Sequence, residues 1–438
     1  MTTRRGEQRA WYFYDWANSA FYTTGVALLL GPWISAVAKN AADARGFIYP
    51  LGIPVDARSY WAYLVSLSVF SQVLALPVLG AIADYGKRKR ELLAVFAWLG
   101  AAANIAMFSV DGGRYLWGGG LFLLANFSFG ASVVVYNAFL PEIATVEERD
   151  AVSSNGWGIG YLGGGLLLAL NLLLFAKAES LGISTSLAVR INLASAGVWW
   201  AVFTLIPVAK LRNRPGGKSL PPGRGYLGVG VEQLWHTLRE VSRYPRTLLF
   251  LFAYLVYNDG IQTVIVLAAQ FGQEELKLPM STITTVILLV QFVAFAGALL
   301  FNRMAAAWGA KRAVMAGLAV WTMTLAYIYA LVRTSAGFYA MGVVVGLVLG
   351  GTQALSRSLY SFMIPPGREA EYFGLYEVSD KGTSWLGPLL FGLALQWTGS
   401  FRTAILSLIA FFAAGMFLLA KVDVRAAAVE AGNEAPVR

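Results

Sequence analysis

The chain has 438 residues, of which 57% are hydrophobic and only 13% are charged. Soluble proteins usually contain about 45–50% apolar and about 25% charged residues, and a soluble core of this size cannot bury so large an apolar excess. The composition therefore excludes a soluble globular protein and a disordered one. The lack of cysteine and the single histidine, His236, exclude thiol catalysis, cysteine-based metal sites and Ser-His-Asp triads.

The net charge is +10. In a membrane protein such an excess is typical of cytoplasmic loops that face anionic lipid, so the charge alone does not indicate a nucleic-acid partner. We therefore expect a lipid bilayer as the surroundings of this chain, with no nucleic-acid partner, no cofactor and no metal site.

Hydrophobic runs separated by short polar breaks predict twelve membrane-spanning helices, because each needs about 20 apolar residues. In chain order the spans lie near 11–38, 59–83, 91–110, 115–140, 152–176, 188–209, 246–271, 281–302, 313–332, 336–363, 370–397 and 401–420. The short alternating segments of a β-barrel are not visible in the sequence. The predicted fold class is an all-α membrane protein with two six-helix bundles.

A polar break at 211–245 divides these spans into two sets. Its first part is rich in Pro and Gly, which is typical of a linker. In its second part the apolar residues share one helical face, which predicts a short amphipathic helix on the membrane surface: Val231, Leu234, Trp235, Leu238 and Val241. The predicted domains are an N-terminal bundle at 1–210, a cytoplasmic linker at 211–245, and a C-terminal bundle with a short tail at 246–438.

The two sets of spans repeat in sequence. YNAFLP at 136–141 matches YSFMIP at 360–365, and GIGYLGG at 158–164 matches GTSWLGP at 382–388, both at an offset of 224. A parallel duplication of six spans is how the major facilitator fold is built. The basic residues add an orientation, because 23 Lys and Arg lie in the tails and loops on the side of both termini and 9 on the opposite side. The positive-inside rule then predicts cytoplasmic termini.

The loop after the second span begins with GAIADYGKRKR at 80–90. This segment resembles the loop signature of the major facilitator superfamily, although its Asp-to-Gly spacing is one residue shorter and Tyr85 stands where a basic residue is common. A glycine permits close helix approach, and an aspartate can accept hydrogen bonds from a neighbouring helix N-terminus. The resemblance implies that Asp84 holds the cytoplasmic gate against the eleventh helix, within a gating loop of Gly80, Asp84, Gly86, Lys87 and Arg88. The alternative is a basic loop that only fixes topology.

Three further segments carry a more specific resemblance: WYFYDWANSAF at 11–21, YNDG at 257–260, and the long stretch at 354–388 that begins ALSRSLYSFMIPPGREAEYFGLYEVSDKG. Together they resemble the autophagy-linked vacuolar effluxer family, a branch of the major facilitator superfamily with many bacterial members. The resemblance implies export of small solutes, which in fungal vacuolar members are amino acids. For bacterial members the substrate does not follow from it.

Charged side chains inside membrane spans are costly and usually functional. Asp15-x-x-Asn18-Ser19 and Asp259-x-x-Gln262-Thr263 share one spacing on the first span of each half, as expected for a site near the midplane. For the uncharged Asn and Gln residues the alternative is helix–helix contact, and Asp15 could be hydrated at the interface. The predicted substrate or coupling residues are Asp15, Asn18, Asn137, Asp259, Gln262, Gln353, Arg357, Glu377, Asp380 and Lys381.

The hairpin between the tenth and eleventh spans turns near 365–368, which places Arg357 and Glu377 at similar depths on neighbouring helices. We therefore expect Arg357 to pair with Glu377 or Asp380, either permanently or in only one state of a transport cycle. A separate acidic cluster of Glu142, Glu147, Glu148 and Asp150 is expected to form a solvated loop.

These patterns predict a secondary active transporter in the inner cell membrane, not an enzyme. We expect it to be a monomer that exports a small polar, amino-acid-like solute by alternating access. A proton gradient could drive it, with Asp259 or Asp380 as the titrating group. The alternatives are a lipid scramblase and a polytopic membrane enzyme without a recognisable catalytic motif.

Overall fold

The computed structural model describes residues 4–57, 59–86, 88–214, 232, 239, 243–381, 386–398 and 400–435. Within these ranges it has eleven helices long and apolar enough to cross a membrane. Its only described strands are β1 (Phe47–Ile48) and β2 (Val55–Asp56), which pair antiparallel in a short hairpin. The predicted all-α membrane fold is confirmed.

The first half opens with a continuous helical segment from Arg4 to Asn40. It starts seven residues before the predicted first span at 11–38. It consists of α1 (Arg4–Ala20), a π-helical stretch η1 (Phe21–Leu29) and α2 (Leu30–Asn40). The remaining elements of this half are η2 (Pro50–Gly52), α3 (Tyr60–Gly86), α4 (Lys89–Ala106), η3 (Met107–Ser109), α5 (Tyr115–Ala138), α6 (Leu140–Ile143), α7 (Arg149–Lys177), η4 (Glu179–Leu181) and α8 (Thr185–Lys210).

The second half contains α10 (Pro245–Gln270), η6 (Phe271–Glu275), α11 (Met280–Trp308), α12 (Ala310–Ala330), α13 (Ser335–Phe362), α14 (Glu369–Lys381), α15 (Leu386–Thr398), α16 (Phe401–Leu406), α17 (Ile409–Lys421) and α18 (Val424–Glu430). The predicted span at 370–397 therefore corresponds to two helices, α14 and α15, on either side of 382–385, which lie outside the described residues. Most of the predicted amphipathic helix at 231–241, including His236, also lies outside them, as does Lys87.

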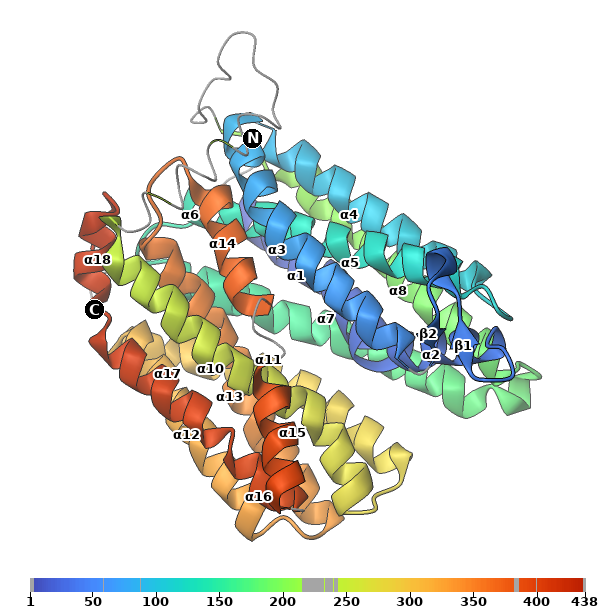
Figure 1. The fold of residues 1–438 in the computed structure, drawn as a ribbon. Helices are drawn as coiled ribbons and strands as arrows, with labels where there is room; N and C mark the ends of the chain where they lie inside the picture. Colours follow the sequence, from blue (N-terminus) through green and yellow to red (C-terminus); the bar gives the residue numbers. More distant parts are fainter. Residues whose placement is uncertain are drawn as a thin grey trace.

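The helices before the linker pack mainly with one another, and so do those after it. Contacts between the two groups join α14 to α3 and α5, and α7 to α11 and α13. Figure 1 shows the two groups side by side near the N-terminus and α6, and diverging toward the opposite end, where α16 and the β1–β2 hairpin lie far apart. We call the first end the linker side, which carries Gly86 at the end of α3, Lys89 at the start of α4, residues 144–148 and Asn213. We call the other end the hairpin side.

Two glycines bring α3 and α14 into direct contact on the linker side. A Cβ atom on Gly80 would overlap the carbonyl oxygen of Ala370, and one on Gly374 would lie 2.7 Å from Pro77 Cα. Only residues without a side chain allow backbones of different helices to approach so closely. The packing of small residues therefore sets the distance between the two halves at this end.

Candidate gate and substrate-binding site

Asp84, in the last turn of α3, lies at the N-terminus of α14 and is 4% exposed. Its Oδ1 accepts a hydrogen bond from the backbone N–H of Ala370 at 3.1 Å, and its Oδ2 accepts one from Glu371 at 2.9 Å. The first N–H groups of a helix have no partner within the helix, and the helix dipole favours an anion there. Asp84 therefore caps a helix that belongs to the other half of the chain.

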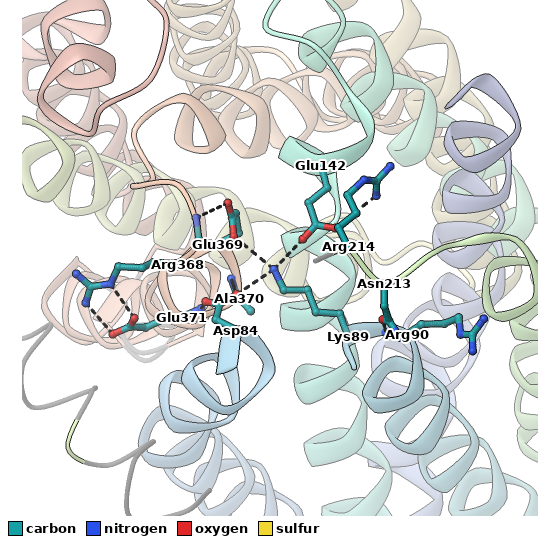
Figure 2. A network of polar contacts seen from close by, with 11 residues as sticks. Asp84, Lys89, Arg90, Glu142, Asn213, Arg214, Arg368, Glu369, Ala370 and Glu371 are labelled. Carbon is teal, nitrogen blue, oxygen red and sulfur yellow. Dashed lines mark hydrogen bonds and ion pairs between the residues drawn. The ribbon is translucent and has the colours of Figure 1, made fainter. Parts of the chain in front are cut away.

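Lys89, at the start of α4, holds three carboxylates around this contact (Figure 2). Its Nζ lies 3.0 Å from Asp84 Oδ1, 2.9 Å from Glu142 Oε1 and 3.4 Å from Glu369 Oε2. Glu369 comes from the second half and the other three residues come from the first. We call Asp84, Lys89, Glu142 and Glu369, with the Asp84 contacts to α14, the outer cluster.

The acidic loop expected to be solvated is instead engaged in contacts on the linker side. Glu142 pairs with Lys89, and its Oε2 also lies 3.4 Å from Nη1 of Arg214, in the first part of the linker. Asp150 accepts a hydrogen bond from Ser358 Oγ of the second half at 2.5 Å. The prediction was wrong for Glu142 and Asp150, because charge alone does not reveal which partners the fold brings to these residues, whereas Glu147 is exposed as expected.

Glu148 contacts the start of α1. It lies in the loop between α6 and α7, outside the spans. A hydrogen bond from the Thr145 backbone N–H, together with the nearby Arg4 guanidinium, holds the pKa of Glu148 below its usual value. Arg4 Nη2 lies 2.9 Å from Glu148 Oε2, and Gln8 Nε2 donates to the same oxygen at 3.2 Å. The N-terminal extension of the first helix is thus part of the closed linker side.

Arg357 of α13 is buried among residues of the first half and is 3% exposed. Its Nη1 donates to Asp15 Oδ2 at 3.2 Å and to Asn137 Oδ1 at 3.3 Å. Its Nη2 donates to Asp15 Oδ2 at 3.3 Å and to the Ser153 carbonyl at 2.9 Å, and its Nε donates to Ser153 Oγ at 2.9 Å. A guanidinium has five N–H groups, so all of them have acceptors from the first half.

Aromatic rings enclose the same guanidinium. Arg357 Cζ lies 4.7 Å from the Trp11 ring centroid, 5.4 Å from that of Trp157 and 5.6 Å from that of Tyr136. The Tyr136 hydroxyl donates to Asp15 Oδ2 at 2.7 Å, which adds a further hydrogen bond to the anion. Ring faces attract a cation, so these contacts add to the ion pair. We call Arg357, Asp15, Asn137 and Ser153 the inner cluster.

The ion pair of Arg357 is therefore with Asp15, not with Glu377 or Asp380 as the helical spacing predicted. Spacing along neighbouring helices gives the depth of a side chain but not the face on which it lies, and Arg357 reaches into the opposite half. Glu377 still borders the inner cluster, because Asn137 Nδ2 donates to its Oε1 at 3.4 Å.

Asp380 of α14 belongs to a separate polar network in the second half. Its Oδ1 accepts hydrogen bonds from the Tyr254 hydroxyl at 2.7 Å and from Asn258 Nδ2 at 2.8 Å. Asn258 Oδ1 in turn accepts one from Gln353 Nε2 at 2.8 Å. We call Asp380, Tyr254, Asn258 and Gln353 the Asp380 network.

Asn258 and Asp259, consecutive residues of α10, contact backbone groups of both α14 and α15. Asn258 Nδ2 donates to the carbonyl oxygen of Asp380, in the last turn of α14, at 3.2 Å. Asp259 Oδ2 accepts a hydrogen bond from the backbone N–H of Gly387, the second residue of α15, at 2.9 Å. α10 thus contacts backbone groups on both sides of 382–385, which lie outside the described residues.

The Asp-x-x-x-Ser/Thr segment on the first span of each half packs against a glycine in a similar way. Thr263 lies directly against Gly387, where an added Cβ would overlap its Oγ1. In the first half, a Cβ on Gly160 of α7 would lie 2.9 Å from Ser19 Oγ and 3.0 Å from Asp15 Cβ. Each Asp-x-x-x-Ser/Thr segment thus packs on a glycine of the fifth span of its own half. The aspartates differ in partner, because only Asp15 has a described cation beside it.

Two predicted residues stand apart from these networks in the described structure. Asn18 is buried, and its Nδ2 has no hydrogen-bond partner among the described residues. Gln262 is half-buried on α10. Lys381 is the last described residue of α14, and its side chain lies outside the described part of the structure. In the gating loop, Gly86 ends α3 and the exposed Arg88 precedes α4.

Sequence reasoning missed several residues of these networks. Tyr136 precedes Asn137 in the repeated motif at 136–141, so the repeat could have indicated that Tyr136 belongs to the site. Glu369 directly follows the predicted turn at 365–368, which gave it no distinct signal. Lys89 was interpreted only as part of the basic run at 87–90. Ser153 and Tyr254 carry no sequence signal, since a serine or tyrosine within a span is ordinary.

The model of the family described as "Vacuole effluxer Atg22 like" matches residues 3–432. An uncharacterised MFS-type transporter, YxiO of Bacillus subtilis (strain 168), is 28% identical over 95% of this chain and 94% of its own. Autophagy-related protein 22-1 of Penicillium rubens is 25% identical over 96% of this chain and 90% of its own.

Solved structures show the same fold at lower identity. The proton:xylose symporter XylE has a TM-score of 0.70 at 12% identity and covers 95% of this chain and 94% of its own. The human organic anion transporter MFSD10 has a TM-score of 0.69 at 14% identity and covers 96% of this chain and 100% of its own. The fold is thus that of the major facilitator superfamily, and the chain belongs to the vacuole effluxer Atg22-like family of multi-pass membrane transporters.

Proposed function

We propose that this transporter exports a small polar, amino-acid-like solute by alternating access. The observation that carries this proposal is that the outer and inner clusters both lie toward the linker side and both join residues of opposite halves. Contacts of this kind close one end of a solute pathway and can be broken without unfolding either half. Residues 1–210 and 246–438 would be the two moving units, with 211–245 connecting them.

We assign the linker side to the cytoplasm, because 23 of the Lys and Arg residues lie in tails and loops on that side and 9 on the other. The structure would then be a state closed to the cytoplasm. A cysteine placed at the exposed Glu434 should react only from the cytoplasm, and one at Leu51, which is 94% exposed, only from outside. The chain has no native cysteine, and labelling of Glu434→Cys from outside would reverse the assignment.

We assign proton coupling to Asp259. Its side chain is 3% exposed, and its Oδ1 has no hydrogen-bond partner among the described residues. A buried carboxylate without a cation is costly, and taking up a proton removes that cost. The other carboxylate oxygen of Asp259 accepts a hydrogen bond from Gly387 of α15. Protonation of Asp259 would therefore be coupled to a movement of α10 relative to α15.

The decisive experiment compares solute flux with lipid flipping in sealed proteoliposomes. We expect gradient-dependent movement of a radiolabelled amino acid or a related small solute and no acceleration of fluorescent-lipid flipping. The buried networks between the halves favour this outcome over a scramblase, which needs a polar path open to lipid. Lipid flipping without solute flux would favour the scramblase, and turnover of a solute into a product would favour an enzyme.

A further inference from the structure

We propose that the substrate site recognises a protonated amine, with Asp380 as its counter-ion, and that a carboxylate on the substrate is not required. This inference rests on the proposed transport function and names the chemical class of the solute. It is carried by the different availability of two charged groups, Arg357 and Asp380, to a bound solute.

Arg357 is not available to a substrate anion in this structure. All five of its N–H groups already have protein acceptors, and Asp15 neutralises its charge at 3.2 Å. A substrate carboxylate would have to displace a buried aspartate that also accepts from Tyr136. Such an exchange leaves one carboxylate stranded, and an unpaired buried charge is costly.

Asp380 has the opposite character. It is half-buried, and no Lys or Arg side chain among those described pairs with it. Its Oδ1 accepts from the neutral groups of Tyr254 and Asn258, which orient the carboxylate without cancelling its charge. An ammonium group is the ligand that supplies both the missing charge and the missing hydrogen-bond donors.

Two stacked tyrosines of the second half lie beside this carboxylate. The Tyr254 ring stacks on that of Tyr376 with centroids 4.3 Å apart, and the Tyr254 hydroxyl donates to Asp380 Oδ1 at 2.7 Å. An acid bordered by aromatic faces suits an organic ammonium ion, because the rings attract the cation and accommodate an apolar body.

The position of Asp380 along α14 places this site relative to the gate. The outer cluster contacts the first turn of α14, whereas Asp380 is the residue before its last described one. Asn137 of the inner cluster donates to Glu377, three residues before Asp380. A solute bound at Asp380 would therefore sit near the inner cluster and farther from the outer cluster. Binding and gate opening would then be adjacent events.

The test uses matched sets of probes on the full-length protein in detergent. Each set contains an amino acid, its decarboxylated amine and its deaminated acid, such as leucine, 3-methylbutylamine and 4-methylpentanoate, with equivalent sets built on phenylalanine and alanine. Thermal unfolding midpoints report binding, since a ligand of the folded state raises them by mass action. We expect the amino acid and the amine of at least one set to raise the midpoint, and none of the acids to do so.

Asp380→Asn keeps the size of the side chain and removes its charge, so the concentration of amine needed for half the shift should rise about ten- to a hundredfold. Glu179→Gln is the control, because it removes an exposed carboxylate at the hairpin side. Loss of the amine response in both variants, or its persistence in Asp380→Asn, would overturn the assignment.

The probe sets decide the question in the wild type even if Asp380→Asn does not fold. Stabilisation by the acids, or by none of the amines, would refute amine recognition. If the acids are also transported in proteoliposomes, the transport function stands and only this inference falls. If no solute of any class is transported, the proposed function itself is wrong.

Discussion

The guanidinium of Arg357 in α13 and the carboxylate of Asp15 in α1 form an ion pair of 3.2 Å that joins the two halves of the chain. Because the acceptors of Arg357 come from α1, α5 and α7, this one side chain connects the second half to three helices of the first. In the proposed transport cycle, opening of the linker side would require all of these contacts to separate. The pair is therefore the contact whose removal tests the proposed closure most directly.

The first prediction concerns Asp15→Asn, which removes the charge of the pair. Charge-assisted hydrogen bonds contribute about 1.5–3 kcal/mol, so the closed state should lose about ten- to a hundredfold in population. A cysteine at Ser361, which is buried on the linker side beside Arg149, should then be modified faster by a soluble maleimide. The protein should stay monodisperse, because water can reach Arg357 once the halves separate.

A permanent structural ion pair predicts a different result for the same variant. Breaking such a pair strands a buried charge, which costs about 3–5 kcal/mol of folding stability. Aggregation of Asp15→Asn, or an unchanged labelling rate at Ser361→Cys, would therefore reject a breakable contact.

The second prediction concerns Asp84→Asn in the outer cluster. Asparagine has one acceptor oxygen where the carboxylate uses two for Ala370 and Glu371, and it no longer attracts Lys89. We expect transport in proteoliposomes to fall about tenfold or more while ligand-induced thermal shifts persist. Asp111→Asn, which removes a carboxylate at the hairpin side, serves as the matched control and should transport normally. Normal flux in Asp84→Asn would leave the 80–90 loop with a topological role alone.

The third prediction compares two glycines. Gly80→Ala places a Cβ against the Ala370 carbonyl, so α3 and α14 cannot close to their present distance. Gly120→Ala adds the same atom in α5, where nothing lies within 4 Å. We expect faster labelling of Ser361→Cys and reduced transport only in Gly80→Ala. Equal behaviour of the two variants would mean that the close approach at Gly80 does not limit closure.

The fourth prediction concerns Asp259→Asn and the proton. The amide still has an oxygen to accept from the Gly387 N–H, so folding should change little. Exchange of solute for solute across the membrane should continue, whereas uptake driven by a pH gradient should be lost. A variant that still responds to the gradient would place the coupling group elsewhere, with Asp380 the next residue to examine.

The membrane class and the all-helical fold could be predicted from the sequence, because long hydrophobic runs report them directly. Twelve spans were predicted, whereas the described residues contain eleven helices long and apolar enough to cross a membrane. The predicted span at 370–397 is described as α14 and α15, and residues 382–385 between them lie outside the described residues. The contact of Asp84 with the eleventh span could be anticipated from the motif. Its role as a gate remains a prediction.

The partner of Arg357 could not be found from the sequence. Helical spacing relates residues within a half, whereas Asp15 lies 342 residues away and on a helix of the other half. The pairing of Glu142 with Lys89, within the first half, also depends on how separate loops pack, which the sequence pattern does not report.

The most direct test of the account is a pair of distances measured by spin labels in the same preparation. Labels at Glu147 and Trp308 report the linker side, and labels at Ser180 and Arg333 report the hairpin side; all four positions are exposed. Combining each pair with Asp84→Asn should lengthen the linker-side distance and shorten the hairpin-side distance, because two rigid halves rock about the site between them. Unchanged distances, or both distances changing in the same direction, would contradict alternating access controlled from the linker side.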